Sequence, residues 1–368
     1  MDFFSVKENV GYRNPIYGKG IIYQDKVYYA YSQFAREIVE KGSGEIIGNE
    51  SIRINHFEPS HLRFNESCRN ILLMFAGGFG DAVTLGTLLP DVANKYDITF
   101  DICSDRVKWD TIFKPMGMTG KFVTFPPDLQ ALSYYDAVLT DITKFYPGND
   151  GLRISPVIQL CRGFKINPED LRPVYNIPED IEKKWMLPFT NTIRVAVNFD
   201  SNGHVKSYPE ELIYELLKGL YQIGFEVYIL GIKKKDTKKY PFKGIYDLRS
   251  HTTIPEAATI LSQMDVVLGV DSLMIHLSNL LEKPSIVLLS TTPSSAFEWH
   301  RNISCLSSKI KCSPCFEVFD HCPIGYEQCR AFYHKSINEE VIIKEIIRKV
   351  YTSFSKKCRK NEIPVNNM

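Results

Sequence analysis

Gly269–Leu277 reads Gly-Val-Asp-Ser-Leu-Met-Ile-His-Leu, a sequence that could bind phosphate where a strand passes into a helix. The free backbone amides of a first helical turn carry a partial positive charge and attract anions. Asp271 or Ser272 would be the N-cap of this helix, and capping alone would explain either residue. His276, four residues after Ser272, could donate to a phosphate or a diol, although a lone histidine is more often structural.

A second polar segment, residues 198–209, also lies between a strand and a helix. Its Lys206 could supply the point charge that pairs with a diphosphate. Taken alone, an exposed loop lysine would be the simpler interpretation. Thr292, in the loop Ser290-Thr291-Thr292-Pro293, could flank the same nucleotide.

A third turn reads Gly77-Gly78-Phe79-Gly80-Asp81. Its glycines, Gly80 among them, permit a tight turn and the close approach of a ligand to the backbone. It is not the dinucleotide fingerprint, because Asp81 takes the place of the third glycine. Asp81 could be a general base for a hydroxyl acceptor, although a helix N-terminus favours the ionised carboxylate and weakens it as a base. A role for Asp81 as the N-cap of the helix explains the residue equally well.

Four of the nine cysteines lie close together in the sequence. Cys312 and Cys315 form a C-x2-C pair, and Cys322 and Cys329 follow. In a chain without an export signal this clustering favours a metal over disulfides, and four thiolates suit tetrahedral Zn or Fe. The ligand type does not decide between the two metals. The other cysteines are expected to be buried or free thiols: Cys68, Cys103, Cys161, Cys305 and Cys358.

The polar turns need a scaffold of buried strands, and the sequence provides two series of them. Apolar runs predict parallel strands at 71–76, 98–102, 121–125 and 136–139, then at 194–198, 226–231, 266–270 and 285–289. Helical periodicity lies between them at 82–95, 106–116, 209–223, 254–264 and 272–281, and a short helix is expected at 178–186. Such βαβ series indicate parallel sheets, with ligands at the carboxyl edge.

The expected organisation is α/β with two Rossmann-like domains facing across a cleft. Residues 1–68 read as a small β-rich appendage, although residues 33–41 could be a helix. We assign residues 69–188 to an acceptor-side domain and residues 189–355 to a donor-nucleotide domain that includes the four-cysteine finger, residues 312–329. Residues 356–368 are expected to be a flexible tail.

Bulk composition argues against several classes of partner. The 368 residues carry a formal net charge of +1, so no overall field attracts nucleic acid. No run approaches the roughly 20 apolar residues of a membrane span, and the N-terminus lacks the pattern of a signal peptide. We therefore expect a soluble, cytoplasmic protein. The basic run 232–239 is interpreted as a solvated loop.

These motifs, in this order, resemble the lipopolysaccharide heptosyltransferase family, glycosyltransferase family 9. The resemblance rests on the turn that ends at Asp81, on Lys206 before Tyr208-Pro209, on Val270–Leu277 and on Lys283–Leu288. It covers roughly residues 70 to 330 and implies a GT-B fold. It further implies inverting transfer of a sugar, typically heptose from ADP-heptose. The autotransporter heptosyltransferases of this family look similar in carrying an iron-binding four-cysteine finger and an added N-terminal β domain.

By this resemblance Asp81 matches the catalytic aspartate and Lys206 matches the phosphate-binding lysine. Asp271, Ser272 and His276 match the nucleotide-binding turn. The family usually has a glycine after the Asp-Ser/Thr pair, where this chain has Leu273. A side chain there narrows the approach to the phosphates, although the Leu273 amide could still serve.

The leading hypothesis is therefore a glycosyltransferase whose nucleotide diphosphate sugar donates to a hydroxyl acceptor. Lipid-linked oligosaccharide, capsule precursor and protein serine all remain open as acceptors, and so does homo-oligomer formation. One alternative is a catalytically altered nucleotide-sugar-binding or assembly protein, which Leu273 keeps open. A weaker alternative is a sugar-nucleotide epimerase, which would need further acid/base carboxylates.

Overall fold

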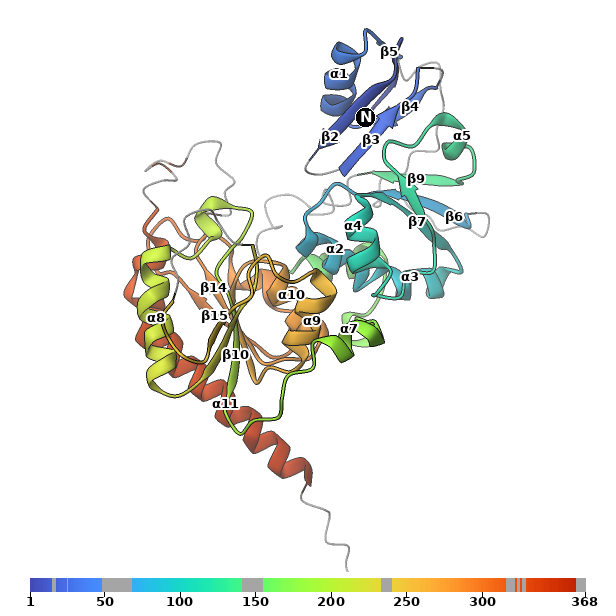
Figure 1. The fold of residues 1–368 in the computed structure, drawn as a ribbon. Coiled ribbons are helices and arrows are strands. Elements are labelled where there is room, and N and C mark those ends of the chain that lie inside the picture. The colour runs from blue at the N-terminus through green and yellow to red at the C-terminus, as the bar shows by residue number, and fades with distance from the viewer. Residues whose placement is uncertain are drawn as a thin grey trace, which may run out of the picture. The chain divides into compact units, whose positions relative to one another are not determined.

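The computed structural model describes residues 1–14, 18–24, 26–47, 68–140, 155–232, 240–315, 322, 325 and 329–361. The chain divides into two compact units (Figure 1). The first contains Met1–Gly148 and Pro156–Asn176, and the second contains Asn149–Ser155 and Ile177–Met368. None of the described helices combines the length and apolar character needed to cross a bilayer.

The first unit is built on four parallel strands in the order β8-β7-β6-β9. They are β6 (Asn70–Met74), β7 (Thr99–Ser104), β8 (Phe122–Thr124) and β9 (Ala137–Thr140), which confirms the strands predicted here. The helical segments are α2 (Phe79–Gly86), α3 (Leu89–Tyr96), α4 (Arg106–Lys108), the π-helical turn η2 (Trp109–Phe113), α5 (Leu129–Leu132), α6 (Pro156–Gly163) and η5 (Pro168–Asp170).

The single helix expected over residues 82–95 is wrong, because the structure has two helices there. Pro90 lies in the first turn of α3, where its missing amide costs no hydrogen bond. The chain therefore ends α2 at Gly86 and starts a new helix at Leu89.

The N-terminal residues form a small antiparallel layer with one helix. Strands β1 (Asp2–Ser5), β4 (Tyr28–Ala30) and β5 (Glu45–Ile47) pair in the order β4-β1-β5. Strands β2 (Val10–Asn14) and β3 (Gly18–Ile22) form a hairpin, and α1 spans Ser32–Lys41, close to the helix expected at 33–41. The segment from 48 to 67 lies outside the described residues.

This layer shares one hydrophobic core with the four-stranded sheet. Phe4 and Phe34 belong to the same buried cluster as Leu72, Met74 and Val138 of the sheet. Because β6 is buried on both faces, it needs cover from both sides, and the N-terminal layer covers one of them.

Polar contacts fix the same junction. The Tyr12 hydroxyl donates to the carbonyl of Phe125, and the Tyr31 hydroxyl donates to the carbonyl of Met74 at 3.2 Å. The N-terminal layer therefore packs as part of the first unit.

The second unit contains six parallel strands in the order β12-β11-β10-β13-β14-β15. They are β10 (Arg194–Asn198), β11 (Glu226–Ile229), β12 (Ile245–Asp247), β13 (Val266–Val270), β14 (Ser285–Leu289) and β15 (Ile303–Ser307). The helical segments are α7 (Glu179–Lys184), η6 (His204–Lys206), α8 (Glu210–Gln222), α9 (Ile254–Ser262), α10 (Leu273–Leu280), η7 (Ser294–Phe297), η9 (Ala331–Tyr333), η10 (Lys335–Ile337) and α11 (Glu339–Asn361). Numbered from β10 as 1, the strand order is 3-2-1-4-5-6, the doubly wound order.

Helices cover both faces of this sheet (Figure 1). Alternate strand residues such as Val195 and Val197 pack in one cluster with side chains of α8 and α11. On the other face Gly269 lies so close to Ile275 of α10 that a Cβ there would come within 3.1 Å of its side chain.

Strands β12 and β15 and helix α11 were not predicted. Helix α11 continues to Asn361, so the flexible tail expected from residue 356 does not begin there. Residues 362–368 lie outside the described part of the chain.

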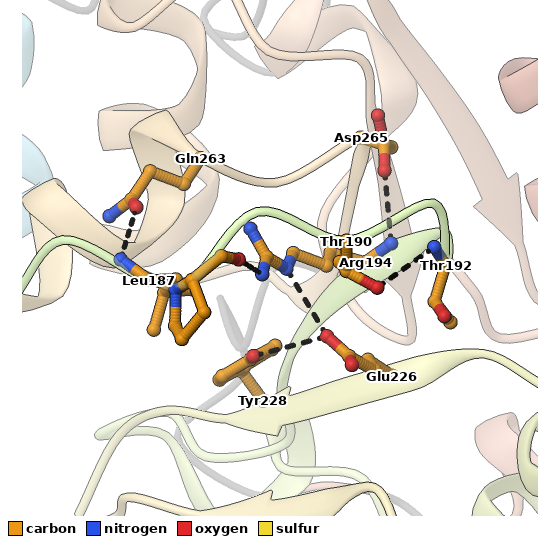
Figure 2. Close-up of polar contacts among 9 residues, drawn as sticks. Leu187, Thr190, Thr192, Arg194, Glu226, Tyr228, Gln263 and Asp265 are labelled. Carbon is orange, nitrogen blue, oxygen red and sulfur yellow. Dashed lines mark hydrogen bonds and ion pairs between the residues drawn. The ribbon is translucent and has the colours of Figure 1, made fainter.

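The segment before β10 is tied to the amino edge of the second sheet (Figure 2). The Leu187 amide donates to Gln263 Oε1 at 2.7 Å. The Arg194 amide donates to Asp265 at 2.9 Å, and the Arg194 guanidinium pairs with Glu226 at 3.2 Å. The chain around the domain boundary expected between residues 188 and 189 is therefore bound to the second unit.

Replacement of Phe34 by Ala tests the shared core of the first unit. Phe34 is 4% exposed and its ring meets those of Phe4, Tyr12 and Phe125. Loss of a buried phenyl ring is expected to lower the free energy of unfolding by about 3–5 kcal/mol.

Chemical denaturation measures this change, with Tyr134→Ala as the control because Tyr134 is 71% exposed. Equal effects of the two substitutions would show that the N-terminal layer is not part of this core.

Candidate active site

The second sheet reverses its strand order between β10 and β13, and Asn198 lies at that point. Asn198 is 3% exposed and ends β10. Its Oδ1 accepts from the Ser272 hydroxyl at 2.5 Å, and its Nδ2 donates to the Leu230 carbonyl at 3.1 Å. One side chain thus joins the ends of β10 and β11 to the turn after β13. Ligands of doubly wound sheets bind at this switch point.

Gly231 makes room for the Asn198 side chain. It has a φ of +126°, which favours glycine, and a Cβ there would lie 2.6 Å from Asn198 Nδ2. Any other residue at 231 would therefore displace the amide that ties these strand ends together.

Helix α10 begins after Ser272 without a side-chain cap. Ser272 is the N-cap by its extended backbone, yet its side chain does not cap the helix, because the hydroxyl is bonded to Asn198. The half-buried Leu273 is the first helical residue. The first-turn amides of a helix point outward with partial positive charge, so this end suits a phosphate.

A cation and an anion pair beside this helix end. Lys206 Nζ lies 3.2 Å from Asp271 Oδ2, and the buried Thr292 donates its hydroxyl to the same oxygen at 2.5 Å. The Ser201 hydroxyl donates to the Asp271 carbonyl at 3.0 Å. The structure thus brings together three residues singled out in the sequence, Lys206, Asp271 and Thr292.

His276 lies one turn along α10 and contacts His300. The two ring nitrogens, His276 Nδ1 and His300 Nε2, are 3.2 Å apart. The His276 ring also stacks on Phe297, with centroids 5.6 Å apart. Burial, followed by the charge of His276, lowers the pKa of His300 well below its usual value.

The start of the four-cysteine segment is hydrogen-bonded to the loop that carries Thr292. The Ser313 hydroxyl donates to the Ser290 carbonyl at 2.6 Å, and the buried Ser290 hydroxyl donates to the carbonyl of Val205 at 2.7 Å. Val205 directly precedes Lys206, so two serines connect the cysteine segment to the lysine loop.

The four cysteines lie in a segment that is described only in part. The structure describes Cys312, Cys315, Cys322 and Cys329, whereas 316–321, 323–324 and 326–328 lie outside the described residues. Burial raises the pKa of the Cys329 thiol. A hydrogen bond from the Ala331 backbone lowers this pKa in part, and the charges of the other three thiols raise it. No group of three or more His, Cys, Asp or Glu side chains among the described residues has the arrangement of a metal site.

In the first unit Asp81 lies in the first turn of α2. Its Oδ2 accepts from the Gly78 amide at 2.8 Å. Gly78 is the N-cap, so Asp81 is the third helical residue of a capping box and not the N-cap weighed above as an alternative. The residue is exposed, so the cap leaves the carboxylate accessible to solvent. Gly80 is the second residue of the same helix. A Cβ at Gly77 would lie 2.9 Å from that of Asp81, so the turn needs glycine.

A buried lysine lies near this turn and was missed in the sequence. Lys108 is 4% exposed, and its Nζ lies 5.6 Å from the ring centroid of Phe79 and 6.0 Å from that of Phe75. Burial lowers the pKa of Lys108, while the negative charges of Asp105 and Asp81 act in the opposite direction. Lysine is rarely this buried without a partner or a role.

Two further residues of the candidate site, Asn198 and His300, were not singled out from the sequence. Asn198 carried a signal, because it is a polar residue at the end of a buried strand. His300 had only its place near the Thr292 loop, and Lys108 had none, since a single lysine in a helical segment is ordinary.

Comparison with known proteins found one family model that matches part of the chain. The family model for glycosyltransferase family 9 (heptosyltransferase) matches residues 168–323. Residues 168–323 of this chain are therefore similar to a family 9 glycosyltransferase domain. The match confirms the resemblance inferred from the motifs and the enzyme class, a glycosyltransferase. The matched range contains the Lys206 loop, the Asp271 turn and Thr292.

Solved structures share the fold around this family 9 domain. Heptosyltransferase II of E. coli aligns with a TM-score of 0.57 at 11% identity, over 77% of this chain and 99% of that one. TibC of enterotoxigenic E. coli H10407, an iron-containing dodecameric heptosyltransferase, aligns with a TM-score of 0.58 at 12% identity, over 92% and 87%. A family 9 glycosyltransferase of Veillonella parvula DSM 2008 aligns with a TM-score of 0.56 at 12% identity, over 80% of this chain and 99% of that one. A comparison with curated sequences found no match.

These likenesses establish the α/β, GT-B-like fold with parallel sheets. The cleft between two domains stays a prediction, as do the roles of the individual site residues in the family 9 domain.

Replacement of Lys108 by Met tests why a lysine is buried here. The Lys108 ammonium binds its proton less tightly in the folded chain than in the unfolded chain. Raising the pH toward 10.5 therefore stabilises the fold. Lys108→Met removes that penalty, so we expect a higher melting temperature than wild type at pH 7. The difference should narrow as the pH rises toward 10.

The control is Lys114→Met, the same change at an exposed lysine of the same unit, which should shift the free energy of unfolding by less than about 0.5 kcal/mol. If Lys108→Met destabilises the protein equally at every pH, the amine is held by stabilising pairs and the interpretation is wrong.

Proposed function

We propose that this chain transfers a sugar from a nucleotide diphosphate to a hydroxyl group, with heptose from ADP-heptose as the donor and with inversion at the anomeric carbon. The observation that carries the proposal is the amino end of α10. It has no side-chain cap, lies at the switch point of the second sheet, and has the Lys206–Asp271 pair beside it. TibC, which shares the fold, has been solved with ADP-D-β-D-heptose.

In this proposal the second unit binds the donor and stabilises the leaving group. As the bond between the sugar and the diphosphate breaks, negative charge develops on the departing oxygen. The Lys206 ammonium and the first-turn amides at Ser272 and Leu273 would stabilise that charge electrostatically. Asp271 and Thr292 hold the lysine in place before the donor binds.

The first unit supplies the carboxylate of Asp81 for the acceptor. Asp81 would orient the acceptor hydroxyl and accept its proton as the new glycosidic bond forms. Its hydrogen bond to the Gly78 amide fixes the carboxylate at the helix end. The acceptor class proposed is a protein serine or a glycan hydroxyl, and TibC gives a precedent only for the donor.

A structural metal is part of the proposal. Cys312, Cys315, Cys322 and Cys329 have the donor chemistry for Fe or Zn. TibC is described as iron-containing. Bound there, the metal would hold the segment that contains Ser313, whose hydroxyl supports the Ser290 loop.

The alternative is a nucleotide-sugar-binding or assembly protein on the same fold that lacks transfer activity. Leu273 favours it, because its side chain lies at the first position of α10. Screening ADP-, GDP- and UDP-sugars by thermal shift tests binding, since a ligand at 100 times its Kd stabilises the fold by about 2.7 kcal/mol. Donor hydrolysis or transfer by the purified protein then separates an enzyme from a binding protein.

Two substitutions should separate binding from chemistry. Lys206→Met removes the charge proposed to pair with the diphosphate, so we expect the Kd for ADP to rise roughly 10- to 100-fold. Asp81→Asn should leave ADP binding within about twofold of wild type and abolish transfer, a loss on the order of 100-fold or more. Calorimetry measures the first and ADP release from ADP-heptose the second.

Each variant is the other's control, because one affects binding and the other turnover. Normal turnover by Asp81→Asn would exclude the catalytic role, and unchanged ADP affinity in Lys206→Met would exclude the phosphate role.

The metal is tested by elemental analysis of the purified chain. We expect about one Fe or Zn per chain, because four thiolates complete a tetrahedral shell. Cys315→Ser should lose that metal, whereas Cys68→Ser, a change outside the cluster, should keep it. A metal-free wild-type protein, or an unchanged metal content in Cys315→Ser, would contradict the finger.

A further inference from the structure

His276 is held on two sides by the segment that follows the Thr292 loop. Its Nδ1 lies 3.2 Å from Nε2 of His300, and its ring stacks on Phe297 with an interplanar angle of 21°. Phe297 and His300 also pack together, with centroids 5.1 Å apart. The ring orientation of His276 is therefore set by the side chains of this segment as well as by α10.

The charge state of His300 follows from where it lies. Only 8% of the residue is exposed, and an imidazolium loses its hydration when it is buried. Burial and the neighbouring His276 both lower the pKa of His300, so this ring is neutral at pH 7. A neutral imidazole has one N–H donor and one acceptor nitrogen.

The contact between the rings then restricts His276. If His300 donates through Nε2, His276 accepts on Nδ1 and carries its own proton on Nε2. If His276 donates through Nδ1, the neutral His300 accepts, and a second proton on Nε2 makes His276 a cation. A diphosphate offers only acceptors, so it selects the states with the proton on Nε2.

The position of His276 on its helix matches this requirement. Cα–Cβ bonds in a helix tilt toward its amino end, so side chains cover the preceding turn. His276 lies four residues after Ser272, and the preceding turn is the one with amides suited to a phosphate.

We propose that His300 is a positioning residue, which holds His276 by its Nδ1 so that the Nε2 proton is presented to the diphosphate of the donor. The inference rests on the proposed function and adds a residue that acts only through another. His300 itself does not contact the nucleotide in this arrangement. It replaces the carboxylate or carbonyl that often fixes the tautomer of a functional histidine.

The test compares three variants by ADP calorimetry, with GDP and UDP as parallel ligands. His300→Phe keeps a flat buried ring but removes both nitrogens, and should weaken ADP binding roughly five- to tenfold. His300→Gln places an amide nitrogen where Nε2 was and should restore the affinity to within about twofold. His251→Phe is the matched control at an exposed histidine of the same unit.

A double-mutant cycle separates positioning from packing. In a His276→Ala background, His300→Phe should have no further effect on ADP binding. Long-range 1H–15N NMR should show one Nε2-protonated state of His276 in wild type with ADP bound, and a mixture of tautomers in His300→Phe.

If His300→Phe binds ADP as tightly as the wild type does, this inference alone is overturned. If His300→Phe weakens ADP binding as much in the His276→Ala background as in the wild type, the inference is also overturned, because His300 would then act by packing. Failure of the wild type to bind ADP, GDP or UDP would overturn the proposed function first, and this inference with it.

Discussion

The hydrogen bonds of Asn198 are the constraint on which the carboxyl edge of the second sheet depends. A doubly wound sheet leaves its first and fourth strands side by side, with their loops diverging to opposite faces. Asn198 bridges that divergence, since it accepts from Ser272 and donates to the Leu230 carbonyl. A buried polar group destabilises the fold when it loses its partner. Disruption of either hydrogen bond of Asn198 is therefore expected to loosen all three strand ends.

The cost of this arrangement falls on helix α10. A serine at an N-cap normally bonds to an amide of the first turn, a contact worth about 1 kcal/mol. Here the Ser272 hydroxyl is used by Asn198, so the helix gives up that stabilisation and its amides stay available for an anion. Local stability is often lower at functional positions for this reason. Thr292 and Lys206 both contact the Asp271 carboxylate next to this end.

Sequence patterns predicted the parts of the fold that periodicity and burial determine. The strands β10, β13 and β14 contain apolar runs, and the polar residues that follow β10 and β13 led to Lys206 and Asp271. Strands β12 and β15 were missed because each is only partly buried and lacks an apolar run. The contact of His276 with His300 joins residues 24 apart in the chain, and no local pattern encodes such a pairing. The burial of Lys108 is equally invisible, since it depends on where Phe75 and Phe79 place their rings.

The two units solve the same packing problem differently. Helices α8 and α11 pack on one face of the second sheet, whereas the N-terminal antiparallel layer packs on one face of the first. E. coli heptosyltransferase II is almost fully covered by 77% of this chain, so about a quarter of this chain lies outside the shared fold. The N-terminal layer buries Leu72 and Met74 of β6, the strand that leads into the Asp81 turn. Removal of that layer would expose the strand and loosen the turn, so the layer supports the position of Asp81 even though it does not contact the carboxylate.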